Sequence, residues 1–389
     1  MNARTDEALL ERVRSRLAAD AVEPTAAVIA DAIRAESGGV LGDTDLLAAL
    51  RYLQTELTGA GRLEELLAEP GIADLLVVGP DRVWVDRGAG LELTPIRFDD
   101  DAAVRRLAGR LALAAGRRLD DAQPWVDAQL SNLGRRGYTV RLHAVIPPLA
   151  ADGTCLSLRV LRSAGMGFDA LVATGAVPAP AAEMLQTILR ARLSFLIIGG
   201  TGTGKTTLLG ALIGQMGPAE RVLCVEDAPE LTPTHPHVVR LVARTANVEG
   251  AGEVPVRMLV RQALRMRPDR IIVGEVRGAE VIDLLTALNT GHDGSGGTLH
   301  ANSTAEVPAR MEALAALGGM GRDALHSQLS AAVQVVLGLA RTADGTRGLS
   351  EIGVLRRGSD GLVTTVPVWL RSTGFTPHRA LLDEMVAAR

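Results

Sequence analysis

The chain has 389 residues, of which 47% are hydrophobic, and a formal net charge of −4 at pH 7. This length and apolar content allow two or three domains, whereas the acidic balance and the scarcity of aromatic residues disfavour a nucleic-acid-binding protein with base-stacking platforms. No window approaches the roughly eighteen apolar residues that span a bilayer, and the N-terminus lacks a signal-peptide pattern, so we expect a cytoplasmic protein without a transmembrane segment.

Residues 1–67 are predicted to form a helical N-terminal region. The apolar residues Leu9, Val13 and Leu17 return to one face at helical spacing within an Ala/Leu/Glu/Arg-rich stretch. The pattern favours a packing element over a dedicated partner-binding helix.

Residues 68–162 are predicted to form a smaller α+β domain of a PAS-like kind. Two apolar runs flank Gly79-Pro80-Asp81, which is the chemistry of a hairpin turn. Helical spacing follows over residues 101–115, and two further strands are expected over residues 138–146 and 154–162.

Residues 163–180 mix glycine, alanine and proline without sustained periodicity, so we expect an interdomain linker there. Residues 181–389 are predicted to form an α/β domain, because short apolar runs alternate with helical stretches. Strands are expected to begin near residues 195, 221, 238, 270 and 298, with further β segments at 333–339, 349–355 and 362–370.

The strand expected at residues 195–198 leads directly into a Walker A pattern, GxxxxGK[ST]. Its glycines remove the Cβ atoms that would keep backbone N–H groups from converging on a phosphate, Lys205 supplies positive charge, and Thr206 offers a hydroxyl to Mg²⁺. A dinucleotide-binding fingerprint is excluded, because that motif needs a glycine at position 205. The predicted phosphate-binding residues are Gly199, Gly200, Thr201, Gly202, Thr203, Gly204, Lys205, Thr206 and Thr207.

Carboxylates follow two other predicted strands. Glu275 ends a buried run and suits an atypical Walker B element that supports Mg²⁺ together with Thr206. Glu226 and Glu230 follow the strand near residue 221, where a carboxylate can orient or deprotonate the attacking water. Taken alone, either of these two acidic strand ends would be interpreted as a solvated loop.

A glycine-rich segment, residues 291–302, carries His292 and His300. Its polar groups can hydrogen-bond a phosphate or sense its loss, although a single histidine is more often structural.

The Walker A loop, the carboxylates at Glu226 and Glu230, the strand that ends near Glu275, and residues 291–302 follow one another in this order. They resemble the Walker A, Asp, Walker B and His boxes of the type II/type IV secretion ATPase superfamily. Within it, Thr290-Gly-His-Asp-Gly-Ser295 and Gly297-Thr-Leu-His-Ala-Asn302 are most similar to the CpaF-type (TadA-type) ATPases of Flp pilus assembly. The likeness covers roughly residues 60–360. The chain departs from such relatives at Leu142-His143-Ala144 and in the segment that begins at Ser131.

The resemblance implies a fold and an activity. The fold is a C-terminal RecA-like P-loop ATPase domain preceded by the α+β domain, and the assembly is a homohexamer that converts ATP hydrolysis into domain motion. The implied partner is an inner-membrane platform protein, which places the ring at the inner face of the cytoplasmic membrane, and no direct nucleic-acid contact is expected.

The resemblance also implies roles for single residues. Glu230 is the general-base candidate, and the arginines supply charge to the phosphoryl transition state. The predicted catalytic residues are Glu230, Glu275, Glu226, Arg240, Arg244, His292 and His300, with Arg141 and Arg159 of the N-terminal domain as further nucleotide contacts.

Two other functions stay open. A conjugation-type secretion ATPase uses the same chemistry with a different partner, and a RecA-like DNA helicase or translocase shares the P-loop. With two cysteines, the chain has too few for the tetracysteine zinc module common in general type II secretion ATPases.

Overall fold

The computed structural model describes residues 59–88, 90–134, 136–161, 166–244, 246, 251–341 and 346–389, together with residues 25–38 and parts of 9–17 and 42–53. The chain divides into two compact units, residues 1–162 and 163–389. Parts of the predicted N-terminal helical region, such as residues 1–8 and 18–24, lie outside the described residues.

The described part of the N-terminal region contains helix α2 (Ala26–Glu36). The hydroxyl of Thr25 accepts a hydrogen bond from the backbone N–H of Val28, which caps the helix. Ile29 and Ile33, one turn apart, are buried in a small apolar cluster. Leu9, Val13 and Leu17 lie in the same cluster, so their predicted common face is confirmed.

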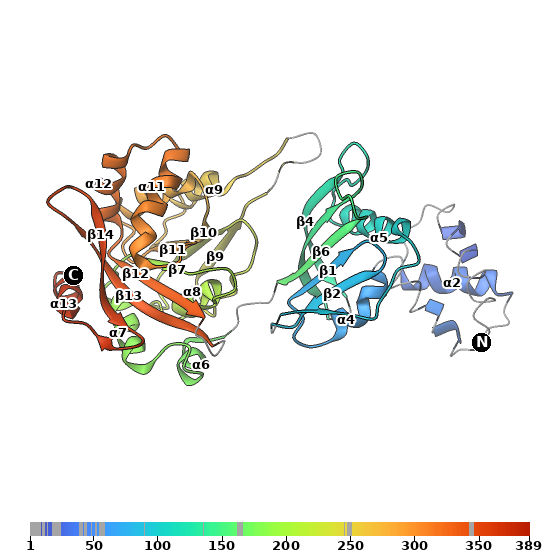
Figure 1. The fold of residues 1–389 in the computed structure, drawn as a ribbon, viewed down its shortest axis with the longest axis horizontal. Helices are drawn as coiled ribbons and strands as arrows, with labels where there is room; N and C mark the ends of the chain where they lie inside the picture. Colours follow the sequence, from blue (N-terminus) through green and yellow to red (C-terminus); the bar gives the residue numbers. More distant parts are fainter. Residues whose placement is uncertain are drawn as a thin grey trace. The chain divides into compact units, whose positions relative to one another are not determined.

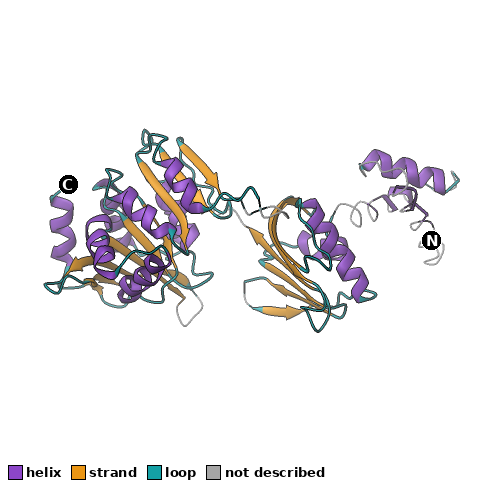
Figure 2. Cartoon of the chain, turned by 90° about the horizontal axis from the view of Figure 1, so that it is seen from above, coloured by secondary structure: helices purple, strands orange, loops and turns teal. Residues whose placement is uncertain are grey.

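The rest of the first unit is a six-stranded antiparallel sheet in the order β3-β2-β1-β6-β5-β4. Helix α5 covers one face of this sheet (Figures 1 and 2). Buried apolar residues of the helix and of the strands belong to one core cluster. The elements are η1 (Gly61–Leu63), α4 (Glu64–Ala68), β1 (Asp74–Val78), β2 (Arg82–Asp86), β3 (Leu91–Leu93), α5 (Asp101–Ala114), β4 (Trp125–Leu133), β5 (Tyr138–Val145) and β6 (Cys155–Leu161).

The predicted hairpin is confirmed, because Val78 pairs with Arg82 across the turn. The helix and the two later strands are confirmed as α5, β5 and β6. Strands β3 and β4 have no counterpart in the prediction. Strand β3 has only three residues, all exposed, which is too short for alternation to indicate a strand. Strand β4 carries an irregularity at Asn132, whose φ is 60°, which interrupts its alternation.

The second unit contains a nine-stranded sheet in the order β15-β14-β13-β12-β7-β11-β10-β8-β9. The strands from β12 to β9 are parallel to one another, and β13 to β15 add an antiparallel edge. The strands are β7 (Phe195–Ile198), β8 (Val222–Glu226), β9 (Val238–Val242), β10 (Arg270–Val276), β11 (Gly296–Leu299), β12 (Val335–Arg341), β13 (Arg347–Arg357), β14 (Val363–Leu370) and β15 (Gly374–Phe375).

Helices cover both faces of this sheet. Phe195 and Ile197 of β7 pack into one core, and Leu196 and Ile198 pack into the other, because successive side chains point to opposite faces. Figure 1 shows α11 and α12 on one side and α6 and α7 on the other. The helices are α6 (Phe168–Ala173), α7 (Ala179–Arg190), α8 (Lys205–Ile213), α9 (Val256–Ala263), α10 (Glu280–Leu288), η2 (Thr304–Glu306), α11 (Val307–Leu317), α12 (Arg322–Ala332) and α13 (Arg379–Ala387).

The linker predicted over residues 163–180 is wrong for most of its length. Phe168, Leu171 and Val177 are buried in the core of the second unit, and the carbonyl of Ala176 accepts a hydrogen bond from Leu349. Helix α6 has only six residues between glycines, which is too short to show helical periodicity in the sequence.

Within the part of the chain that the structure describes, no helix is long and apolar enough to cross a membrane.

Candidate functional site

Four strand ends meet at one edge of the sheet in the second unit. Strands β7, β11, β10 and β8 are parallel neighbours, so the residues that follow them lie at the same carboxyl edge. The Walker A loop follows β7, Glu226 ends β8, Glu275 lies near the end of β10, and His300 follows β11.

The Walker A loop adopts backbone conformations that require glycine. Gly199, Gly202 and Gly204 have φ values of 152°, 71° and 99°. A Cβ atom on Gly199 would lie 2.6 Å from the hydroxyl of Thr203 and 2.7 Å from the carbonyl oxygen of Leu339. Helix α8 then begins at Lys205 without a side-chain cap, so its first N–H groups remain available to an anion.

Lys205 is the only lysine among the 41 lysine and arginine residues of the sequence. Its side chain is buried, and Nζ donates to the carbonyls of Gly199 (2.8 Å) and Gly200 (3.0 Å) and lies 3.4 Å from Nδ1 of His300. Burial lowers the pKa of the ammonium, although nearby Glu275 opposes this effect. The ammonium is thus already placed inside the loop.

Glu226 and Glu230 have different environments. Glu226 is 2% exposed, and its Oε1 accepts from the backbone N–H groups of Glu230 (2.9 Å) and Leu231 (2.8 Å). Glu230 Oε2 accepts from the hydroxyl of Thr206 at 3.3 Å. Glu230 therefore reaches the first turn of α8, whereas Glu226 holds the backbone that carries Glu230.

Burial raises the pKa of both carboxyl groups. For Glu230, the negative charge of Asp227 adds to the effect of burial, and the Thr206 hydroxyl opposes it. For Glu226, the two backbone N–H groups and Arg240 oppose burial without cancelling it.

Gly274 explains why the acid of β10 is displaced from the usual Walker B position. A Cβ atom on Gly274 would lie 3.0 Å from Cγ of Glu226, and the pairing of β10 with β11 is irregular between Val273 and Val276. The glycine leaves room for Glu226 on the neighbouring strand.

Glu275 lies in a charged network. Arg277 donates from Nη2 to Glu275 Oε2 (2.6 Å) and from Nη1 to Asp227 Oδ2 (2.8 Å), so one guanidinium links the ends of β10 and β8. Nε2 of His300 lies 2.7 Å from Glu275 Oε1. Burial alone would raise the pKa of Glu275, but Arg277, His300 and Lys205 together hold it below its ordinary value.

Comparison with known proteins assigns the chain to a family. The family model of the type II/IV secretion system proteins matches residues 56–350. The chain belongs to this family. A protein of Mycobacterium tuberculosis (strain H37Rv) named "Putative conjugal transfer protein" is 63% identical over 350 residues, which are 90% of this chain and 99% of that protein.

One more distant relative and two solved structures resemble the chain in sequence or in fold. The conjugal transfer protein TrbB of Rhizobium radiobacter is 29% identical and covers 70% of this chain and 80% of its own length. A crystal structure of the pilus retraction motor PilT with bound ADP has a TM-score of 0.54 at 21% identity, and covers 83% of this chain and 86% of PilT. The ATPase DotB of Legionella pneumophila has a TM-score of 0.51 at 19% identity, with 84% and 83% covered. These two structures show a shared fold, in agreement with the predicted RecA-like domain.

Of the two predicted histidines, His292 does not lie beside the Walker A loop. His292 precedes β11 and therefore lies at the opposite edge of the sheet from Lys205, where its Nδ1 is 3.0 Å from the carbonyl oxygen of Ala287. The glycine-rich segment spans a complete strand, so its two ends are separated. The structure brings only His300 to the loop.

The four predicted arginines all contact other residues of the protein. Arg240 Nε lies 3.5 Å from Glu226 Oε2, so it supports the site from β9, and Arg244 donates to the carbonyl of Gly252 (2.7 Å) without a described contact to the loop. In the first unit, Arg141 pairs with Asp127 and Arg159 pairs with Asp74. Arg141 and Arg159 lie directly opposite each other on β5 and β6, and their contact with a nucleotide stays a prediction.

Asp227 and Arg277 were missed by the sequence-based prediction. Asp227 directly follows Glu226, and Arg277 lies two residues after Glu275, so their positions at strand ends were the available signal. Their pairing depends on the adjacency of β8 and β10, which the chain order of the strands does not reveal.

The Walker A loop opens onto a cavity of about 350 Å³. The residues that line it are Gly199, Gly200, His300, Ala301, Asn302, Glu306 and Arg310.

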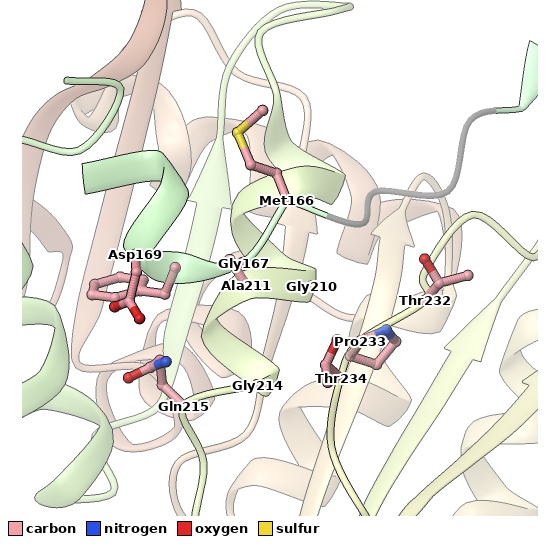
Figure 3. Close-up of a pocket in the computed structure, with 11 residues that line it drawn as sticks. Met166, Gly167, Asp169, Gly210, Ala211, Gly214, Gln215, Thr232, Pro233 and Thr234 are labelled. Atoms are coloured by element: carbon pink, nitrogen blue, oxygen red, sulfur yellow. The ribbon is translucent and has the colours of Figure 1, made fainter. Parts of the chain in front are cut away.

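A second cavity of about 290 Å³ lies at the C-terminal end of α8. Figure 3 shows Asp169 and Gln215 on one side of this helix and Thr232 to Thr234 on the other. Neither lysine nor arginine is among its lining residues, and Asp169 adds negative charge. The first cavity is therefore the one that suits phosphate.

The site fits Mg²⁺ only in combination with a phosphate ligand. Within the described residues, no group of three or more His, Cys, Asp or Glu side chains is arranged to hold a metal. Thr206 and the neighbouring carboxylates would supply some of the oxygen ligands, as is usual where Mg²⁺ shares its shell with nucleotide phosphates.

Proposed function

We propose that this chain is the ATP-hydrolysing subunit of a secretion-type motor. The observation that carries the proposal is the meeting of Lys205, Glu230, Glu275 and His300 at the carboxyl edge of one sheet, beside a glycine loop whose backbone is shaped for phosphate. Bound ATP and Mg²⁺ would supply the phosphoryl group and neutralise its charge.

The residues divide the work by position. Lys205 and the first N–H groups of α8 would bind phosphate, and Thr206 with Glu275 would hold Mg²⁺. Glu230 is the base that takes the proton of the attacking water, since it is the carboxylate that contacts the first turn of α8. Arg277 and His300 fix the carboxylate of Glu275.

Replacing Lys205 with alanine is expected to lower kcat/KM for ATP hydrolysis by about 10²-fold or more, because a cation aimed at the phosphates is lost. Phosphate release by the purified full chain measures this effect. The matched control is Arg356→Ala, which removes an exposed cation on β13. Equal rates for the Lys205→Ala variant and the unaltered chain would contradict the site, and absence of any turnover in the unaltered chain would contradict the function.

The pH dependence of hydrolysis tests Glu230. A base must be ionised, so the rate falls as the pH drops through the pKa of Glu230, which burial and Asp227 raise above its ordinary value. In the Asp227→Asn variant the pKa of Glu230 falls, and the acid limb of kcat/KM is expected at lower pH. An acid limb that stays in place, or moves to higher pH, would count against Glu230 as the base.

We further propose that the motor is a homohexamer that acts through an inner-membrane platform protein in Flp-type pilus assembly. Arg141 and Arg159 of the N-terminal unit would be further nucleotide contacts. The support is the likeness of residues 290–302 to CpaF-type ATPases.

A conjugation-type secretion ATPase is the second candidate, and the names of the 63% and 29% identical relatives, both conjugal transfer proteins, favour it. Cells carrying Lys205→Ala separate the two processes. Loss of surface pili with normal DNA transfer supports pilus assembly, whereas loss of DNA transfer with normal pili supports conjugation. ATPase activity stimulated by single-stranded DNA would instead indicate a DNA translocase.

A further inference from the structure

Arg310 is a cation beside the Walker A loop that none of the four boxes contains. It lies on α11 and lines the same cavity as Gly199, Gly200 and His300. Its side chain is exposed, and no hydrogen bond or ion pair to it occurs among the described residues. Arg240 and Arg277, in contrast, are held by carboxylates.

The cavity lies at the end of the loop that serves the terminal phosphates. In a Walker A loop the backbone N–H groups hold the α- and β-phosphates, and the lysine reaches the β- and γ-phosphates. Nζ of Lys205 contacts the carbonyls of Gly199 and Gly200 and approaches His300. Gly199, Gly200 and His300 all line the cavity, so the cavity adjoins the side of the loop where Lys205 would reach the γ-phosphate.

The acid in the cavity does not neutralise Arg310. Glu306 is one helical turn before Arg310, but its Oε2 accepts the backbone N–H of Asn302 at 3.0 Å. No ion pair joins Glu306 to Arg310 in the described part of the chain. A guanidinium with free donors is suited to phosphate oxygens, which it can bind in a bidentate manner.

We infer that Arg310 binds the terminal phosphate of the nucleoside triphosphate and so distinguishes the triphosphate from the diphosphate. This inference rests on the proposed function and deepens it. The four arginines predicted from the sequence are engaged in ion pairs or with a carbonyl, whereas Arg310 lines the cavity beside the loop and can respond to the arrival of the γ-phosphate.

Binding of fluorescent ATPγS and ADP to the full chain tests the role of Arg310. Arg310→Ala is expected to weaken ATPγS binding by about tenfold or more, which is the range for a lost hydrogen bond to a charged group, and to change ADP binding by less than about twofold. Arg310→Lys keeps the charge without the bidentate geometry and is expected to fall between. The control is Arg356→Ala, at the opposite edge of the sheet, which should leave both affinities unchanged.

Two results would overturn the inference. One is an unchanged affinity of Arg310→Ala for ATPγS, and the other is an equal weakening of both nucleotides, because the side chain would then serve the fold or the diphosphate. Thermal unfolding without nucleotide shows whether the variant is folded. If the unaltered chain binds neither nucleotide, the proposed function itself fails. If it binds both and Arg310→Ala behaves like it, only the inference about Arg310 fails.

Discussion

Replacing Glu230 with glutamine is expected to lower kcat for ATP hydrolysis by about 10²–10⁴-fold, the usual contribution of a general base. Nucleotide binding should remain within a few-fold of the unaltered chain, because glutamine keeps an oxygen that can accept from the Thr206 hydroxyl. Phosphate release and ATPγS affinity, measured on the same preparation, separate the two effects.

The neighbouring acid provides the sharpest comparison. Glu226→Gln keeps an acceptor for the N–H groups of Glu230 and Leu231, so its kcat is expected to fall much less than that of Glu230→Gln. Glu384→Gln, an exposed position on α13, serves as the control. If Glu226→Gln costs more activity than Glu230→Gln, the two assignments must be exchanged.

Replacing Arg270 with methionine is expected to destabilise the second unit by about 3–5 kcal/mol, since it breaks a buried ion pair and removes two hydrogen bonds to backbone carbonyls. Arg270 is 2% exposed, and it donates to both carboxylate oxygens of Glu220 (2.8 and 3.1 Å). It also donates to the carbonyls of Leu189 (3.0 Å) and Gly294 (3.1 Å).

Urea-induced unfolding of the full chain, followed by far-UV circular dichroism, measures this loss. Arg356→Met is the matched control, because it removes an exposed arginine from β13 and should change the free energy of unfolding by less than about 0.5 kcal/mol. A change below about 1 kcal/mol for Arg270→Met would mean that Arg192, which also contacts Glu220, carries the ion pair alone.

The elements with local patterns were predictable from the sequence. The glycines and lysine of the Walker A loop encode its conformation within eight residues, and the buried runs of β7, β8 and β10 read directly as strands. Glu226, Glu230 and Glu275 were found because each lies at or just beyond the end of such a strand.

Other features depend on which strands become neighbours. The contact between Arg277 and Asp227 requires β8 beside β10, and the cavity contact of Arg310 requires the start of α11 to lie near Gly199. His292 was misplaced because β11, at about 3.3 Å per residue, separates it by about 13 Å from the residues that follow the strand. Sequence proximity to His300 was therefore misleading.

The single lysine gives the molecule an unusual chemical property. Apart from the α-amino group, Lys205 is the only primary amine of the chain. Burial lowers its pKa, so a larger fraction of this amine is in the neutral, nucleophilic form than for an ordinary surface lysine. An amine-selective acylating reagent would thus report on one side chain per subunit. The mass added to the chain over time would report how readily the loop opens to the reagent, without any engineered label.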